Sequence, residues 1–349
     1  MDSTTLQMLA LLRASLAGQK PDPLPATEEE WQKLFRLARK HAVVTMINDA
    51  IEQLPADLRP QGDIAISWAL SADRTRYHFH HQEKVLADIR RRAADDGLQT
   101  VVVKGLSLAA CYPVPSSRAC GDIDLFFEPR EQDAYRRGNA LLGNADAQCD
   151  GKHAEFLVDG VSVENHYTLL DQNYRSQRRA ERYIRSTVKD ITPDGCLSPM
   201  GNMAYLLMHT ISHITAKFKL PLRNVLDWGM FLKANRDRLD PAECHRVMRH
   251  IGMDDAFNML TLLSAEFIGA DLATFISGKI RQDDVDKMRE LILDKSYLAP
   301  VPRELRFIKR LRTRYRRNRQ RRWLYRYLPS TGLERLCGNL IRLVHKDNG

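Results

Sequence analysis

One stretch, residues 100–127 (TVVVKGLSLAACYPVPSSRACGDIDLFF), constrains the fold more than any other part of the chain. Its β-branched run at 100–103 predicts a buried strand that ends at Lys104. The short apolar segment 106–111 predicts one or two helical turns, and a proline-rich loop then leads to a second strand at 121–127. A strand, a short helix and a second strand in succession predict a core that mixes α and β structure.

The second strand carries two carboxylates in the sequence Gly121-Asp122-Ile123-Asp124. Because side chains alternate between the two faces of a strand, Asp122 and Asp124 are expected on one face, about 7 Å apart. Hard divalent cations such as Mg²⁺ prefer oxygen ligands of this kind. The pair therefore predicts a metal site, and the alternative interpretation is a pair of turn-capping acids at a strand start.

A β-hairpin is predicted further along the chain. Asp159-Gly160 lies between two alternating runs at 154–158 and 161–166, and this dipeptide is a strong hairpin signal. In the second strand Ser162, Glu164 and His166 share one face. If this strand lies beside the strand of Asp122 and Asp124, Glu164 supplies a third carboxylate.

Together these residues resemble a known family. Lys104-Gly105, Tyr112-Pro113, Arg118 and the Gly-Asp-Ile-Asp run are similar to the signature of the uncharacterised nucleotidyltransferase family, within the DNA polymerase β-like superfamily. The Val-Glu-Asn-His run at 163–166 stands where members of that family carry an acid followed by His. The resemblance implies an α+β fold, in which a small mixed sheet forms the nucleotidyltransferase core between N-terminal and C-terminal helical regions.

The resemblance also implies an activity and its residues. It implies that an NMP group moves from an NTP, such as ATP, to an acceptor, with release of pyrophosphate. Asp122, Asp124 and Glu164 would be the catalytic residues and would bind two Mg²⁺ ions, with Mn²⁺ as the alternative metal. The implied nucleotide- and phosphate-binding residues are Lys104, Gly105, Ser107, Arg118 and Gly121.

Other polar residues are candidates for the same cleft. Lys152 and His153 precede the hairpin, where they would neutralise phosphate charge or belong to a surface loop. His209 and His213 lie one helical turn apart, a spacing that could bind metal, but the Glu of a zinc-protease HExxH motif is absent. The resemblance places a His, an Arg and an Asp of the following helices in the cleft, and a buried polar network is the alternative. The candidate cleft residues are Lys152, His153, His166, His213, Arg223 and Asp227.

The chain is expected to divide into three regions. Residues 1–97 predict helices, with Thr27 and Glu30 forming a capping box at one helix start. Residues 98–196 predict the αβ core. Residues 197–349 predict a second helical region that ends in a basic tail.

The charge of the chain is positive and unevenly spread. The formal net charge is +9 and the sequence pI is about 9.3. Much of the excess lies at 303–326, where cations alternate with aromatic side chains. Such a stretch would suit nucleic acid, an anionic membrane, or a surface helix with solvated arginines.

Composition sets further expectations. The six cysteines include no CxxC pair, which favours reduced thiols and a cytoplasmic protein. No apolar run is long enough to span a bilayer, and the N-terminus lacks the features of a signal peptide. Two alternative functions stay open: an inactive module that binds nucleic acid through the basic tail, and a phosphotransferase acting on a small molecule. The acceptor (protein, RNA or small molecule), the preferred NTP and the oligomeric state are not indicated.

Overall fold

The computed structural model describes residues 1–129, 132–148, 151–217, 221–293 and 322–327. The predicted basic tail at 303–326 lies outside the described residues except for its last few positions. The helices are α1 (Ser3–Ala17), α2 (Glu28–His41), α3 (Val44–Glu52), α4 (Gly62–Asp95), α5 (Gly105–Ala109), α6 (Gln132–Leu142), α7 (Arg175–Thr187), α8 (Pro199–Lys217), α9 (Leu222–Ala234), α10 (Pro241–Ile251), α11 (Asp254–Ile268) and α12 (Gln282–Leu293). The strands are β1 (Gln99–Val103), β2 (Ile123–Glu128), β3 (His153–Val158) and β4 (Val161–His166).

The strands form one small mixed sheet in the order β1-β2-β4-β3. β2 pairs with β4 in parallel, and the other two pairings are antiparallel. At the tip of the β3–β4 hairpin, Asp159 and Gly160 have φ angles of 47° and 77°, the left-handed values that this tight turn requires. The predicted α+β class, with a small sheet flanked by helices, is confirmed.

Both faces of the sheet are covered by helices. Val102, Leu125 and Phe127 point to a small apolar cluster that includes residues of α4 and α6. Val101, Val103 and Phe126 point the other way, into a larger cluster that includes residues of α1–α3 and α7–α12. Because Asp124 is two residues from Phe126, it lies on the same face as the larger cluster.

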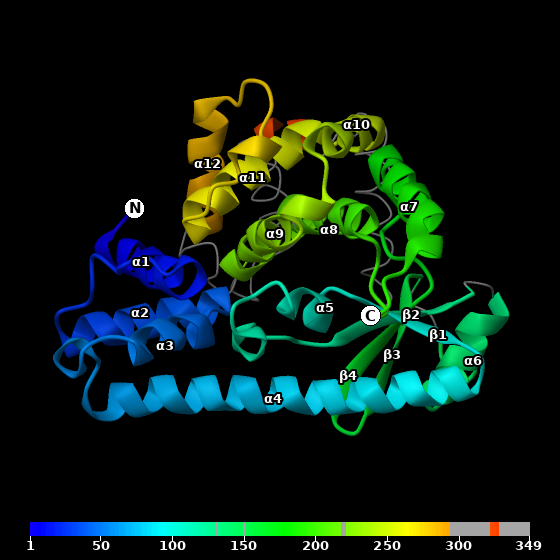
Figure 1. The fold of residues 1–349 in the computed structure, drawn as a ribbon, viewed down its shortest axis with the longest axis horizontal. Helices are drawn as coiled ribbons and strands as arrows, with labels where there is room; N and C mark the ends of the chain where they lie inside the picture. Colours follow the sequence, from blue (N-terminus) through cyan, green and yellow to red (C-terminus); the bar gives the residue numbers. More distant parts are fainter. Residues whose placement is uncertain (130–131, 149–150, 218–220, 294–321, 328–349) are drawn as a thin grey trace, which may run out of the picture.

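Helix α4 runs along one side of the whole molecule, from the N-terminal helices to the sheet (Figure 1). Its Arg76 forms an ion pair of 2.7 Å with Asp49 of α3. Its Gln82 donates from Nε2 to the carbonyl of Gly121, 2.5 Å away. The helix therefore supports the loop that carries the chain into β2. The capping box predicted at the start of α2 is present, with Thr27 and Glu30 bonding reciprocally.

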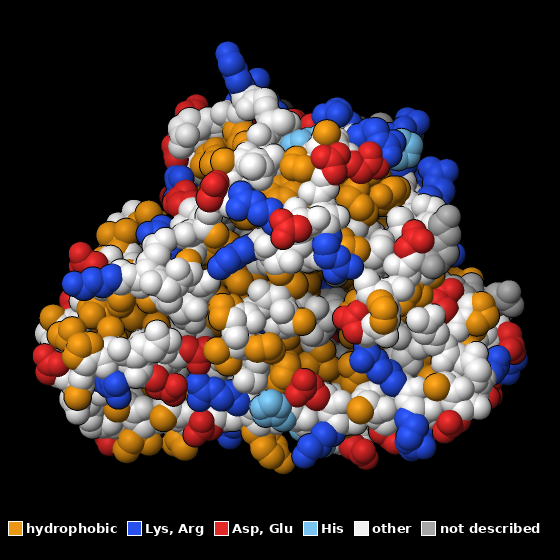
Figure 2. Space-filling model, viewed as in Figure 1, with side chains coloured by type: hydrophobic (Ala, Val, Ile, Leu, Met, Phe, Trp, Pro, Cys, Tyr) orange, Lys and Arg blue, Asp and Glu red, His pale blue; other side chains and the backbone are white. Residues whose placement is uncertain are grey.

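The surface carries charges of both signs. Figure 2 shows basic and acidic side chains interspersed over one face, so the net charge of +9 forms no broad basic surface among the residues described on that face. Across the described parts of the chain, none of the helices combines the length and the apolar character that crossing a membrane would require.

Candidate active site

Three carboxylates meet where β2 and β4 lie side by side. Asp124 and Glu164 are partners in the parallel register of these strands. Asp122 immediately precedes β2, and one carboxylate oxygen of each of the three residues lies within 4.8 Å of the others. The strand of Glu164 therefore lies beside the strand of Asp124, which was the condition for Glu164 to supply a third carboxylate.

Burial and mutual repulsion shape the ionisation of this cluster. Burial, together with the charges of Asp124 and Glu164, raises the pKa of Asp122 to about 6. Burial also opposes ionisation of Asp124, but the Lys104 ammonium and a hydrogen bond from His166 outweigh it and hold the pKa of Asp124 well below its usual range. Such an excess of close negative charge suits a divalent cation with oxygen ligands, so the three acids fit Mg²⁺.

Lys104 faces Asp124 across the β1–β2 pair. Its Nζ lies 2.5 Å from Oδ1 of Asp124. The chain turns sharply here, because Lys104 has a φ of 55° and Gly105 a φ of 38°. A Cβ built on Gly105 would lie 3.3 Å from the carbonyl oxygen of Asp122, so a glycine lets α5 start close to the acids.

His166 orients two of the acids. It is buried, and its Nε2 lies 2.9 Å from Oδ1 of Asp124 and 3.2 Å from Oε2 of Glu164. Nδ1 of His153 is 3.5 Å from the same Glu164 oxygen. Histidines that contact ligating carboxylates fix their direction, so His166 positions the acids although it does not line the cavity described below.

A second polar network joins the proline-rich loop to α9. Nε and Nη2 of Arg118 lie 2.7 and 2.8 Å from the two carboxylate oxygens of Asp227. Tyr112 donates its hydroxyl proton to the same carboxylate, at 2.7 Å. Arg223, also on α9, donates to the carbonyl of Ala119 at 2.6 Å. These contacts join the loop to α9, whereas the alternative interpretation of Arg223 and Asp227 was a buried polar network that holds two helices together.

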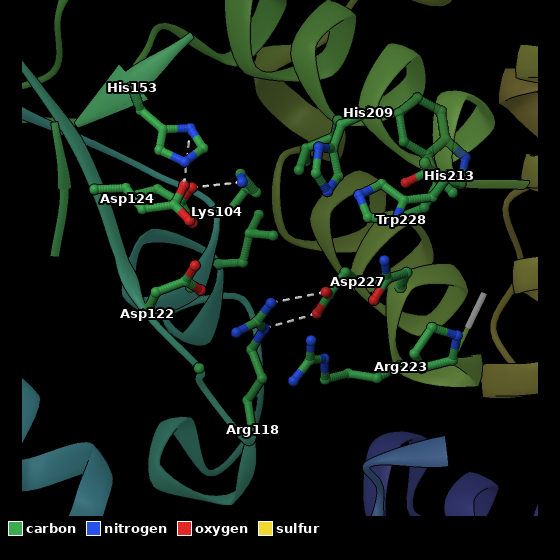
Figure 3. A pocket seen from close by; sticks show the side chains of 18 of the residues that line it. Lys104, Arg118, Asp122, Asp124, His153, His209, His213, Arg223, Asp227 and Trp228 are labelled. Carbon is green, nitrogen blue, oxygen red and sulfur yellow. Dashed lines mark hydrogen bonds and ion pairs between the residues drawn. The ribbon is translucent and has the colours of Figure 1, made fainter. Parts of the chain in front are cut away.

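A cavity of about 430 Å³ brings most of the predicted residues together. Figure 3 shows the carboxylates of Asp122 and Asp124 on one side, with His209 and His213 of α8 across from them. The predicted residues that line it are Lys104, Gly105, Arg118, Gly121, Asp122, Asp124, Lys152, His153, Glu164, His213, Arg223 and Asp227.

Some residues are placed differently from the sequence interpretation. Ser107 donates its hydroxyl proton to the carbonyl of Lys104, 2.7 Å away, and does not line the cavity. Residues that sequence reasoning did not place in the cleft also line it: Leu108, Leu206, His209, Thr210, Pro221, Asn224 and Trp228. The spacing of His209 and His213 on one helix face was the available signal for His209.

A second cavity of about 500 Å³ adjoins the first. The two share four lining residues, Lys152, His153, His209 and His213. The rest of its wall is largely polar and comes from Gly151 before β3, from Ser212 of α8 and from five residues after β4: Thr168, Leu170, Asp171, Gln172 and Asn173.

Comparison with known proteins gives one match. A family model described as an uncharacterised nucleotidyltransferase matches residues 27–269. No curated protein matches the chain, and no solved structure does. The matched range contains the three carboxylates and all the residues that line both cavities.

Proposed function

The chain belongs to the family of uncharacterised nucleotidyltransferases, and from this premise we propose that it transfers an NMP group from an NTP to an acceptor hydroxyl or phosphate, releasing pyrophosphate. One observation supports the proposal most. The carboxylates of Asp122, Asp124 and Glu164 lie within 4.8 Å of one another, on adjacent strands, at the wall of a cavity that also presents Lys104.

In this proposal the three acids hold Mg²⁺, or Mn²⁺ in its place. The bound metal would neutralise phosphate charge and lower the pKa of the attacking hydroxyl. Asp124 is already fixed by its contacts with Lys104 and His166. Asp122, whose pKa is raised to about 6, is ionised above that pH and is then available as a ligand.

The other residues bind and position in this proposal. Lys104 is a partly buried cation beside the acids, and we assign it to the neutralisation of phosphate charge near Gly105 and Gly121. The guanidinium of Arg118 is engaged by Asp227, so we assign Arg118 to holding the loop before Asp122 rather than to contact with phosphate.

A binding experiment tests the proposal. We expect ATP, GTP, CTP or UTP to raise the melting temperature of the wild type when Mg²⁺ is present, because a ligand of the folded state stabilises it by mass action. The Asp122→Asn/Asp124→Asn variant should lose this rise. Asp57→Asn, at an exposed position in a short 3₁₀ turn, should keep it. A rise that is equal in all three proteins contradicts the metal site.

The transferred group is tested on the acceptor. Once the NTP is identified, the wild type is incubated with this NTP and with protein, RNA and small-molecule fractions. The mass gained by the modified acceptor is then measured by mass spectrometry. A gain of one NMP supports nucleotidyl transfer. A gain of one phosphate overturns it in favour of phosphotransfer.

A further inference from the structure

The wall between the two cavities is built from basic and imidazole side chains of two separate elements. Lys152 and His153 come from the entry to β3, and His209 and His213 come from α8. The two α8 imidazoles lie with their ring centroids 4.4 Å apart. This wall, Lys152, His153, His209 and His213, is called the basic wall below.

The backbone holds the basic wall firmly. The carbonyl of Lys152 accepts hydrogen bonds from the backbone of Tyr167 at 2.8 Å and of Thr168 at 3.1 Å. The segment that follows is anchored to α7, where the buried Glu181 carboxylate accepts from the backbone of Leu169 and Leu170. These hydrogen bonds fix the backbone from which the Lys152 side chain projects.

Two ammonium groups, those of Lys104 and Lys152, influence the electrostatics of the basic wall. Burial and the neighbouring Lys104 ammonium lower the pKa of Lys152. Burial, Lys104 and His213 in turn hold the pKa of His209 well below its usual range. Among the described residues, acids that offset the charge of Lys152 include Asp171, Asp124 and Glu164, and the last two are also contacted by other cationic or imidazole groups. An anion beside the basic wall would accept hydrogen bonds from the Lys152 ammonium and from imidazole N–H groups, since a neutral imidazole still offers one donor.

We propose that the basic wall is a phosphate subsite centred on Lys152, beside the three carboxylates, and that it takes a phosphate group of a substrate of the proposed transferase. It rests on the proposed function for its biological meaning. The phosphate has two possible sources. It belongs either to the triphosphate of the NTP, which would reach the wall from the first cavity, or to a phosphorylated acceptor held in the second.

The test uses inorganic phosphate as the probe, in the absence of metal, with calorimetric titration of the full-length protein. Removing a charged hydrogen-bond donor weakens binding by about ten- to a hundred-fold, and we expect this loss for Lys152→Met. Lys152→Arg should retain most of the affinity. Lys84→Met, at an exposed position of α4, is the matched control and should bind like the wild type. The proposal is overturned if Lys152→Met binds phosphate as the wild type does, or if Lys84→Met loses the same affinity.

A competition arm separates the two sources. Phosphate binding is titrated again with saturating Mg²⁺ and a non-hydrolysable NTP analogue. Displacement of phosphate by the analogue assigns the wall to the triphosphate, and simultaneous binding assigns it to the acceptor. Folding of each variant is checked by its thermal transition, and Lys152→Gln, which also removes the charge, provides the measurement if Lys152→Met does not fold.

Failure of this inference is distinguishable from failure of the proposed function. Asp122→Asn/Asp124→Asn leaves the basic wall intact and should still bind inorganic phosphate. If the wild type binds phosphate through Lys152 but binds no NTP with Mg²⁺, the subsite stands and the transferase proposal falls. If Mg²⁺ and NTP bind but phosphate does not, the subsite is overturned.

Discussion

At the scale of single residues, Arg118 and Asp227 form an enclosed ion pair of the site, with side chains 4% and 8% exposed. Removing one member leaves the other charge buried without its partner, which typically destabilises a protein by about 3–5 kcal/mol. We therefore expect Arg118→Met to lower the free energy of unfolding by about that amount, measured by urea denaturation. Loss of the anchor should also weaken Mg²⁺-dependent NTP binding, because the loop leads into Asp122.

The double variant Arg118→Met/Asp227→Leu controls for the charge itself. Since it replaces both charges by apolar side chains of similar size, it should recover much of the lost stability. A single variant as stable as the wild type would show that the pair has no structural role, and the assignment of Arg118 to positioning would then be withdrawn.

Asp122 gives a prediction about pH. Its pKa in the folded protein is about 6, against an ordinary value of 3.8. The folded state therefore binds the proton more tightly than the unfolded state, and its stability falls as the pH rises from about 4 through about 6. Asp122→Asn removes this effect. We expect it to stabilise the metal-free protein at pH 7.5 by about 1 kcal/mol, after allowance for solvent screening, and by much less at pH 4.

Thermal melts of both proteins across this pH range provide the measurement. A stability difference that is constant with pH would show that Asp122 does not carry the shifted proton. With saturating Mg²⁺ at pH 7.5 the order should reverse, because the metal stabilises only the protein with three carboxylates.

The residue scale also shows what could be read from the sequence. The shared face of Asp122 and Asp124 follows from the period of a strand, which is local information. The partner of Arg118 is 109 residues away along the chain, and nothing near Arg118 indicates it. Local pattern therefore predicts the acids well, whereas the bonding of the guanidinium depends on tertiary packing.

At the scale of elements, the tight turn between β1 and α5 determines how closely the chain passes the acids. Gly105 has a φ of 38°, and an added Cβ would meet the Asp122 carbonyl oxygen at 3.3 Å. We expect Gly105→Ala to destabilise the protein by about 1–2 kcal/mol. We also expect it to weaken Mg²⁺ binding, because the backbone of Asp122 has to move.

Gly160 provides the matched control for this turn. It also has a positive φ, 77°, but an added Cβ there would meet nothing within 4 Å. Gly160→Ala should therefore lose comparable stability and keep the Mg²⁺-dependent rise in melting temperature. Equal loss of the metal response in both variants would mean that the effect is general destabilisation and not a property of the β1–α5 turn.

The sequence predicted the hairpin better than it predicted the order of the strands in the sheet. The hairpin was predictable because Asp159 and Gly160 impose a turn that two adjacent strands must obey. The order β1-β2-β4-β3 was not, since the parallel contact of β2 with β4 joins segments separated by α6 and β3. Only the consequence of such a contact could be predicted from the sequence: it would place Glu164 beside Asp124.

At the scale of the whole molecule, the site depends on parts of the chain from all three predicted regions. Gln82 of α4 holds the carbonyl of Gly121, and Arg223 of α9 holds that of Ala119. The face of the sheet that carries Asp124 is covered by the larger apolar cluster, to which α1–α3 and α7–α12 contribute. The division into regions at 98 and 197 stays a prediction, and the contacts across those boundaries suggest a direct test of it.

We expect an isolated fragment of residues 98–196 not to fold on its own. In the fragment Val101, Val103 and Phe126 would lose most of the helices that cover them, and Arg118 would lose Asp227. Burial of each large apolar side chain stabilises the folded state by about 1.5–3 kcal/mol. Exposing this face therefore costs more free energy than the net stability of a typical small domain. Circular dichroism during heating should show a gradual change for the fragment and a cooperative transition for the full chain. A sharp transition in the fragment would instead establish an autonomous αβ domain, to which α8 adds only His209, Ser212 and His213 of the second cavity.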